Sequence, residues 1–256
     1  MLRKSFKLLS QKVFIPLLVL SFLVVGCKNS AAPESPQEEP SAQNEDVTYT
    51  SISGHNTSSG NAVRTTVFNF LKDGTYSCKM DGDTMSSGTF EGRPAQDGKL
   101  TLTVKSTQAD DQDYTDYQFD IDISDGKFVL EGLGEFVHSV STVAVYFYYE
   151  SGARETRDNV AFYSDNTFSI YEEIDDFNNQ TNHHETVFSS IVARGTYTGN
   201  PAADGTISVT VNKMMNAAGT ALEDCSHKQD ITISGGILPV TKSWGATVNS
   251  ERVYPQ

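Results

Sequence analysis

The chain has 256 residues and a formal net charge of −14, from 33 acidic and 19 basic residues. An acidic chain argues against binding to nucleic acid and against electrostatic attraction to anionic lipid, because both of those surfaces are negatively charged. Its length allows one large domain or two ordinary domains, each able to bury a core of its own.

Positions 1–26 have the pattern of an export signal. Four basic residues precede an apolar run over 13–25, which is too short for a comfortable membrane span; they are Arg3, Lys4, Lys7 and Lys12. Because the segment contains no acidic residue, its removal changes the formal charge from −14 to −18. The remaining chain is therefore even more acidic.

The apolar run ends in Val24-Val25-Gly26-Cys27, which resembles the lipobox of bacterial lipoproteins. The resemblance implies cleavage before Cys27, a diacylglycerol thioether on its sulfur and acylation of the new amino terminus. Acyl chains would then attach the protein to the membrane, since each buried methylene contributes roughly 0.8 kcal/mol. The expected location is the bacterial cell envelope, in the outer membrane or at the cell surface. An ordinary cleaved signal peptide and an uncleaved anchor are the alternatives.

Residues 27–46 are interpreted as the lipidated cysteine followed by a tether. Residues 28–46 contain three prolines, a net negative charge and no large apolar residue. Such a segment cannot bury enough apolar surface to offset its ordering entropy, so we expect it to be disordered. It would hold the folded part on the order of a few nanometres from the membrane.

From residue 47 onward the chain repeats itself. Four blocks recur in the same order: 70–77 matches 162–169, 88–98 matches 195–205, 100–104 matches 207–211, and 120–126 matches 230–236. This order indicates a duplication. The two predicted domains are residues 47–140 and 141–256.

The repeated blocks have the features of β-structure. Asp73-Gly74 and Asp165-Asn166 supply residues that tolerate the positive φ of tight hairpin turns, and apolar residues alternate around them, as over 100–104. No stretch after Cys27 shows sustained helical periodicity. The sequence therefore predicts an all-β fold of two tandem antiparallel domains, each an up-and-down barrel or a meander.

The pattern Phe-x-x-Asp-Gly-Thr-Tyr followed by Gly-Thr-aromatic, at 70–76 and 88–90, is similar to the lipocalin-like barrel repeats of bacterial surface lipoproteins. The similarity extends over most of each half and implies a small barrel. The second half departs from the pattern at Asn166, a residue that also tolerates a left-handed turn. The long amino-terminal motif of true lipocalins is absent.

The second half is longer than the first between its first hairpin and Gly195. The excess lies in 172–185, which is acidic and is predicted to be a solvated hairpin tip and the place for an evolved contact surface. His183, His184 and Glu185 are its candidate binding residues. Adjacent histidines point to opposite faces of an extended chain, so no metal-ligand set is predicted. A second acidic run lacks the glycine and glutamate of a calcium loop and is interpreted as solvated; it contains Asp110, Asp111, Asp113 and Asp116.

Residues 143–149 form the most apolar predicted strand of the mature chain. Val145, Phe147 and Tyr149 share a face with Val143, whereas Tyr146 and Tyr148 lie on the other. This pattern favours the first strand of the second domain, with its outer face packed on the first domain. The alternative is an aromatic patch for a partner or an apolar ligand, with Tyr146 and Tyr148 as candidate binding residues.

Two further cysteines follow Cys27. Cys78 alternates with Tyr76 and Met80 on an apolar face, which favours a buried free thiol. A disulfide between Cys78 and Cys225 is the alternative, because exported proteins can form such bonds.

No nucleophile, phosphate-binding or dinucleotide motif occurs, so we expect neither catalysis nor a cofactor. The favoured function is non-catalytic binding of an envelope or host macromolecule through loops, by a protein held at the membrane by the lipid on Cys27. The alternatives are a carrier of a small apolar ligand inside one barrel and an envelope enzyme without a recognisable motif.

Overall fold

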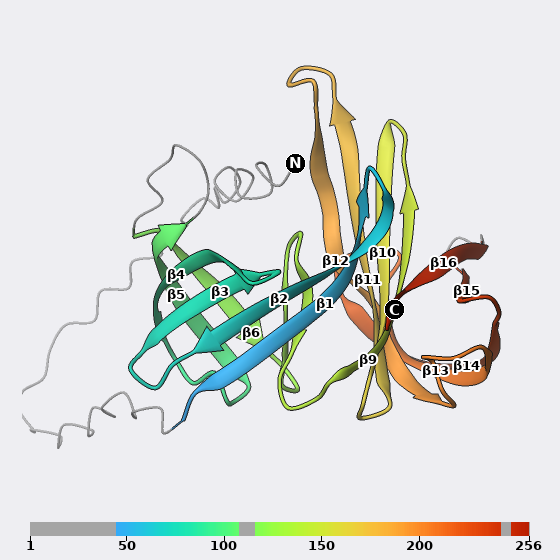
Figure 1. The fold of residues 1–256 in the computed structure, drawn as a ribbon, viewed down its shortest axis with the longest axis horizontal. Coiled ribbons are helices and arrows are strands. Elements are labelled where there is room, and N and C mark those ends of the chain that lie inside the picture. Colours follow the sequence, from blue (N-terminus) through green and yellow to red (C-terminus); the bar gives the residue numbers. More distant parts are fainter. Residues whose placement is uncertain (1–44, 108–115, 242–246, 256) are drawn as a thin grey trace, which may run out of the picture.

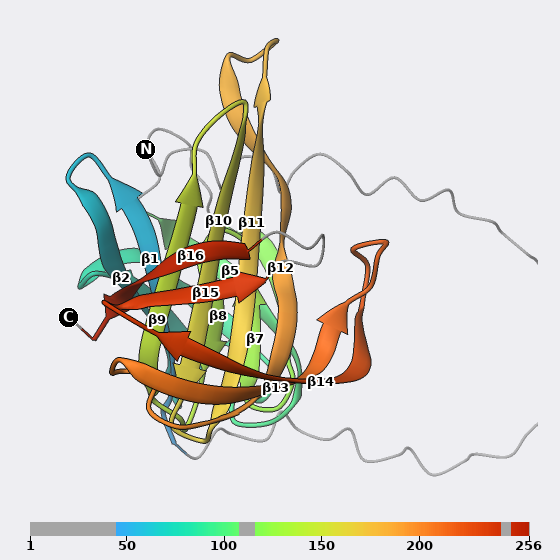
Figure 2. The same ribbon diagram turned by 90° about the vertical axis from the view of Figure 1, so that its right-hand side faces the viewer.

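The computed structural model describes residues 45–107, 116–241 and 247–255, and all regular structure in this part of the chain is β-strand. None of these residues belongs to a helix long and apolar enough to cross a membrane. Two antiparallel sheets of eight strands follow each other along the chain, and each curls into a nearly closed barrel (Figures 1 and 2). The predicted all-β tandem fold is therefore confirmed.

The first barrel contains strands β1 to β8. Their bounds are β1 Val47–Thr57, β2 Gly60–Phe70, β3 Thr75–Met80, β4 Asp83–Glu91, β5 Gly98–Thr107, β6 Gln118–Ile123, β7 Lys127–Leu130 and β8 Gly134–Val137. The second barrel contains β9 Thr142–Glu150, β10 Arg154–Tyr163, β11 Thr167–Asn178, β12 His183–Thr198, β13 Gly205–Met215, β14 Leu222–Ile233, β15 Ile237–Thr241 and β16 Thr247–Tyr254.

Both barrels have the same up-and-down topology. The first six strands form a meander, and the last hairpin returns so that β8 pairs with β1 and β16 pairs with β9. Each barrel has one open seam, between β6 and β7 and between β14 and β15. Across these seams the described residues form only a single bridge beside a tight turn, Ser124 to Lys127 and Ser234 to Ile237.

Equivalent contacts recur in the two barrels. The Tyr49 hydroxyl donates to the carbonyl oxygen of Pro94 at 2.7 Å, and the Tyr146 hydroxyl donates to that of Pro201 at 2.6 Å. Each tyrosine lies on the first strand of its barrel, and each proline lies in the loop before the fifth strand. These shared contacts support the duplication inferred from the sequence blocks.

Large side chains fill the interior of both barrels. In the first barrel the rings of Phe128 and Phe136 stack with centroids 4.8 Å apart, and Tyr49 lies 4.9 Å from Phe128. In the second barrel Phe162 lies 5.1 Å from Tyr197, edge to face. These residues belong to two contiguous cores of buried aliphatic and aromatic side chains. The nearly closed sheets therefore surround packed cores.

A third apolar cluster joins the two barrels. On the outer face of β9, Val145 and Phe147 are buried against Ile52 of β1 and Val63 of β2. Gly54 permits this close approach, because a Cβ atom there would lie 2.3 Å from the Cβ of Phe147. The interpretation of 143–149 as a strand whose outer face packs on the first half is confirmed.

The two described cysteines are both free, so the alternative of a Cys78–Cys225 disulfide is wrong. Cys78 is buried in the core of the first barrel, as predicted, whereas Cys225 is exposed on β14 of the second. Burial raises the pKa of the Cys78 thiol to about 12. The two thiols therefore differ in reactivity, because only the thiolate reacts.

In a chain that begins at Lys28, we expect a maleimide to label one thiol when the protein is folded. When the protein is unfolded in urea, the maleimide should label both thiols. The thiol labelled in the folded chain is Cys225, so Cys225→Ser should leave the folded chain unlabelled at neutral pH. Mass spectrometry of the labelled protein gives the count. Rapid native labelling of Cys78 would contradict its position in the core.

Candidate functional site

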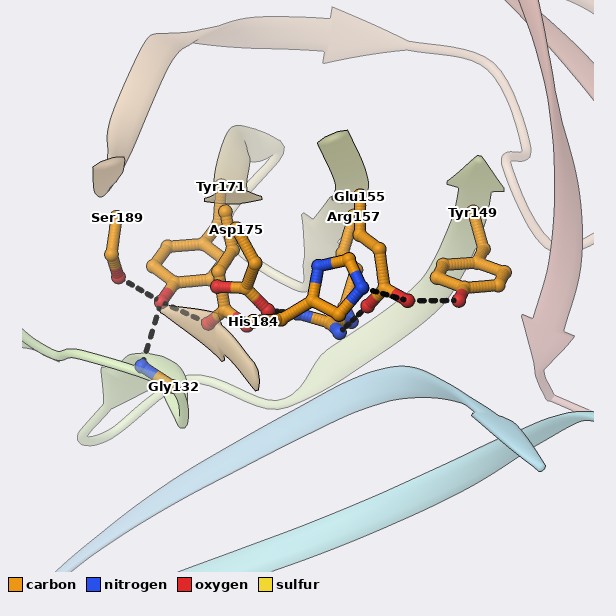
Figure 3. A network of polar contacts seen from close by, with 9 residues as sticks. Gly132, Tyr149, Glu155, Arg157, Tyr171, Asp175, His184 and Ser189 are labelled. Carbon is orange, nitrogen blue, oxygen red and sulfur yellow. Dashed lines mark hydrogen bonds and ion pairs between the residues drawn. The ribbon is translucent and has the colours of Figure 1, made fainter. Parts of the chain in front are cut away.

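The outer face of β10 and β11 carries a group of ionised side chains that we call the arginine cluster: Arg157, Glu155, Glu173 and Asp175 (Figure 3). Nη1 of Arg157 donates to Glu173 Oε1 at 2.7 Å and to Asp175 Oδ2 at 2.5 Å, and Nη2 donates to Glu155 Oε2 at 2.6 Å. One guanidinium thus binds three carboxylates.

The register of one hairpin positions these four residues. In the β10–β11 ladder Arg157 is directly opposite Glu173, and Glu155 is opposite Asp175. Because alternate residues of a strand share a face, all four side chains lie on the same side of the sheet. The Asp165-Asn166 turn sets this register, since Phe162 pairs with Phe168 on either side of it.

Aromatic and polar side chains surround the arginine cluster. The Tyr149 hydroxyl donates to Glu155 Oε1 at 3.1 Å, and Nε2 of His184 lies 3.6 Å from the same oxygen. The Tyr171 hydroxyl accepts the backbone N–H of Gly132 at 3.0 Å. Gly132 belongs to the first half of the chain, so this bond joins the cluster to the other barrel.

Burial shapes the ionisation of the cluster. Burial raises the pKa of Glu173, and the nearby Asp175 carboxylate raises it further, against the opposing effect of Arg157. For Arg157, burial alone would lower the pKa, but its bonds to the carboxylates outweigh this effect and the pKa is raised. Burial and the charge of Asp175 also raise the pKa of Glu131. The cluster therefore holds more negative than positive charge in a partly desolvated place.

A second polar group lies at the junction of the barrels. Glu135 of β8 accepts hydrogen bonds from the Tyr163 hydroxyl at 2.9 Å and from Nη2 of Arg194 at 2.5 Å. Asn159 Oδ1 accepts the backbone N–H of Gly54 at 2.5 Å. A small cavity lined in part by Glu135, Tyr163, Asn159 and Ser51 has room for about one water molecule. These polar bonds and the third apolar cluster hold the two barrels together.

The predicted binding residues do not form one site. His184 lies beside the arginine cluster, whereas His183 is exposed and pairs with Asn178 near the hairpin turn. Glu185 Oε1 accepts the Thr181 hydroxyl at 3.1 Å. The Tyr148 hydroxyl donates to Glu150 Oε2 at 3.1 Å, on the face of β9 opposite to Val145 and Phe147. Tyr146 is fully buried in the second core, so its ring offers no surface to a partner in this structure.

The prediction that 172–185 forms a solvated loop is wrong for most of its length. Strand β11 continues to Asn178 and β12 begins at His183, so only 179–182 form the turn. Glu172 and Asp175 are buried. Acidic residues are tolerated here because cross-strand arginines pair with them: Arg157 binds Asp175, and Arg154 binds Asp176 at 2.7 Å. The excess residues therefore lengthen two paired strands.

The remaining residues selected from the sequence lie outside the described residues or at their ends. Cys27 and three aspartates of the second acidic run, Asp110, Asp111 and Asp113, lie outside the described residues. Asp116 pairs with Lys105. Within 45–107, 116–241 and 247–255, no group of three or more His, Cys, Asp or Glu side chains is arranged to hold a metal ion.

The imidazole of His55 provides a pH-dependent prediction. Its pKa is lowered by burial and by the charge of Arg64, which outweigh the opposing charge of Asp81. As pH falls below the ordinary histidine value of about 6.5, the unfolded chain takes up the proton before the folded one. Stability contributed by neutral His55 is thus present above that pH and lost below it.

We therefore expect the free energy of unfolding in urea to fall between neutral pH and mildly acidic pH, and less steeply in His55→Gln. Other groups titrate equally in both proteins, so the difference between the two slopes isolates His55. Parallel slopes would show that His55 takes up its proton equally in the folded and unfolded states.

Several residues of the site were not selected from the sequence, notably Arg157, Glu155, Tyr171, Glu135 and Arg194. For Arg157 and Glu155, extending the register of the predicted turn would have placed them opposite Glu173 and Asp175. Comparisons with protein-family models, curated proteins and solved structures found no match to this chain.

Proposed function

We propose that this is a lipid-anchored cell-envelope protein that binds an envelope or host macromolecule, without catalysis, through the projecting end of the β9–β10 and β11–β12 hairpins. The observation that carries the proposal is the length of these hairpins, which extend together well past the barrel walls (Figures 1 and 2). The first copy lacks the extension of β11 and β12, because its equivalent strands β3 and β4 are shorter, whereas its β1–β2 hairpin is as long as β9–β10.

Ion pairs brace the projecting strands from both faces. The arginine cluster ties β10 to β11 on the outer face, and Arg154 makes two bonds to Asp176, at 2.7 and 3.0 Å, near the end of the ladder. A preorganised surface loses less conformational entropy on binding than a flexible loop does. This bracing therefore suits a contact surface better than a disordered tip would.

The chemistry of the projecting end suits a mixed polar and aromatic contact. Phe177, 37% exposed, lies edge-on to His184 with ring centroids 5.3 Å apart. The turn at 179–182 adds asparagine, glutamine and threonine side chains. Aromatic rings supply contact area at low entropic cost, and amides supply adaptable hydrogen bonds.

The packed interiors favour binding on the outside over carriage of an apolar ligand. Tyr49, Phe70 and Phe136 are fully buried in the first barrel, and Tyr146 and Phe162 occupy the second. A carrier should release a ligand when the purified protein is extracted with organic solvent, and we expect mass spectrometry of the extract to find none bound stoichiometrically.

The lipid anchor is tested at Cys27. Cells producing the protein with a radiolabelled or alkyne-tagged palmitate should label the wild type and fail to label Cys27→Ser, which should accumulate as the larger precursor. Equal labelling of the two proteins would overturn the anchor and leave the binding proposal to its own test.

Binding is tested with a chain that begins at Lys28. Its affinity is measured for four probes: peptidoglycan sacculi, lipopolysaccharide, immobilised fibronectin and immobilised laminin. We expect saturable binding to one probe and a loss of about tenfold or more in affinity in Phe177→Ala/His183→Ala, about 1.4 kcal/mol. Lys99→Ala, on the first barrel, is the matched control and should bind normally. Failure of every probe, or unchanged binding by the double variant, would overturn the proposal.

A further inference from the structure

Strand β14 has a free edge. Among the described residues β14 pairs along its length with β13 alone, and β15 is far shorter. Residues 223–230 are all exposed, so this part of the β13–β14 hairpin is a ribbon with solvent on both faces. Figure 2 shows the ribbon standing away from the second barrel. An exposed strand edge is a template for pairing with another strand, and an isolated ribbon is only marginally stable.

Ionisable side chains along the free edge change from acidic to basic at its middle. Glu223 and Asp224 precede Cys225 and Ser226, and His227 and Lys228 follow. None of these four ionisable side chains makes an ion pair within the described part of the chain, and Glu223 accepts one hydrogen bond, from Asn216 Nδ2 at 3.2 Å. The equivalent strand of the first barrel differs, because Asp120 of β6 pairs with Lys99 at 2.7 Å.

A β-bulge determines which of these charges share a face. In the β13–β14 ladder Asp224 is opposite Lys213 and His227 is opposite Val211, so Cys225 and Ser226 together face one residue of β13. Lys213 and Val211 are two apart and lie on one face. Asp224 and His227 therefore share a face, and Glu223 and Lys228 share the other.

We propose that two copies of this chain associate by antiparallel pairing of their β14 edges around a two-fold axis at Cys225 and Ser226. A two-fold axis perpendicular to the sheet leaves each side chain on the same face of the sheet. Two residues can therefore face each other across the axis only if they lie on the same face within one copy. Because of the bulge, Asp224 and His227 meet this requirement, and so do Glu223 and Lys228. Asp224 then faces His227 of the second copy, and Glu223 faces Lys228 of the second copy, with four complementary pairs in all.

The symmetry of the charge pattern favours a second copy over an unrelated strand. An unrelated peptide would match the edge by chance, whereas the edge matches itself in the one register that the bulge allows. Exposed ion pairs contribute little each, so the dimer should be weak and should weaken further in salt.

Charge exchange tests the register in a chain that begins at Lys28. By sedimentation equilibrium we expect a concentration-dependent dimer whose dissociation constant rises about tenfold or more in Lys228→Glu and in Glu223→Lys. In Glu223→Lys/Lys228→Glu both charges are exchanged, complementarity returns, and the dissociation constant should return to within about threefold of the wild type. Lys79→Glu, at an exposed position on β3 of the first barrel, is the matched control and should dimerise normally.

The exposed thiol of Cys225 tests the position of the axis. A short bis-maleimide should join two copies through Cys225 with high yield in the wild type, with low yield in Lys228→Glu, and not at all in Cys225→Ser. A monomer at all concentrations, single variants that dimerise like the wild type, a double variant that stays monomeric, or a dimer that resists cross-linking would each overturn the proposal. Circular dichroism confirms that each variant is folded.

Discussion

Gly195→Ala should destabilise the second barrel by about 3 kcal/mol or more. An added Cβ atom would lie 2.1 Å from the carbonyl oxygen of Thr210 and 2.6 Å from the ring of Phe168. The oxygen belongs to the backbone of the neighbouring strand β13, so no side-chain rotation relieves the clash. Gly88 has the same position in the first barrel, 1.9 Å from the carbonyl oxygen of Thr103, and Gly88→Ala should have a similar effect.

Urea unfolding followed by circular dichroism measures this loss. Gly152→Ala is the matched control, because its nearest neighbour would be an ordinary 3.4 Å away and its φ is not positive. We expect that control to change the free energy of unfolding by less than about 0.5 kcal/mol. A small effect at both Gly88 and Gly195 would show that the strands around the shared Gly-Thr-aromatic motif approach less closely than described.

Arg157→Ala should lower the free energy of unfolding by about 2 to 4 kcal/mol, because it leaves three carboxylates together without their counter-ion. The Arg157 side chain is 26% exposed, and those of Glu173 and Asp175 are 13% and 11% exposed. Like charges in such a place repel strongly, so the loss should shrink as the pH is lowered and the carboxylates take up protons.

Arg154→Ala provides the control for Arg157→Ala. Arg154 pairs with Asp176 on the same hairpin, but its side chain is 64% exposed, so its removal should lower the free energy of unfolding far less than Arg157→Ala does. Urea unfolding of both variants at neutral and acidic pH distinguishes the two cases. Equal losses, or a loss in Arg157→Ala that does not depend on pH, would show that the cluster is solvated.

The turn residues and the alternation of apolar with polar residues were sufficient to predict the fold class. The residues of two turns show why. Asp73-Gly74 and Asp165-Asn166 act through local backbone preferences, so each hairpin start can be recognised without knowledge of the rest of the chain. The extension at 172–185 was misread because its acidic residues resemble a solvated loop. Their partners, Arg154 and Arg157, lie across the hairpin and become apparent only when the register is extended from the turn.

Contacts between the barrels could not be predicted in this way. Glu135 and Arg194 are 59 residues apart, and no local pattern relates them. Gly54 is near Phe147 only because β1 and β9 cross at the junction. Such contacts depend on how two completed barrels pack, and the bulges, including the one between Val211 and Lys213, shift the register in ways that alternation alone does not show.

Photo-cross-linking on intact cells tests the proposed binding surface most directly. Benzoylphenylalanine placed at Phe177 of the full chain should, on illumination, give a discrete adduct of higher mass with the bound macromolecule. The same group at Lys99, which is exposed on the first barrel, should give none. The account predicts an adduct that is specific to position 177 and is lost in His183→Ala. No adduct at 177, or the same adducts at both positions, would contradict binding through the projecting hairpins.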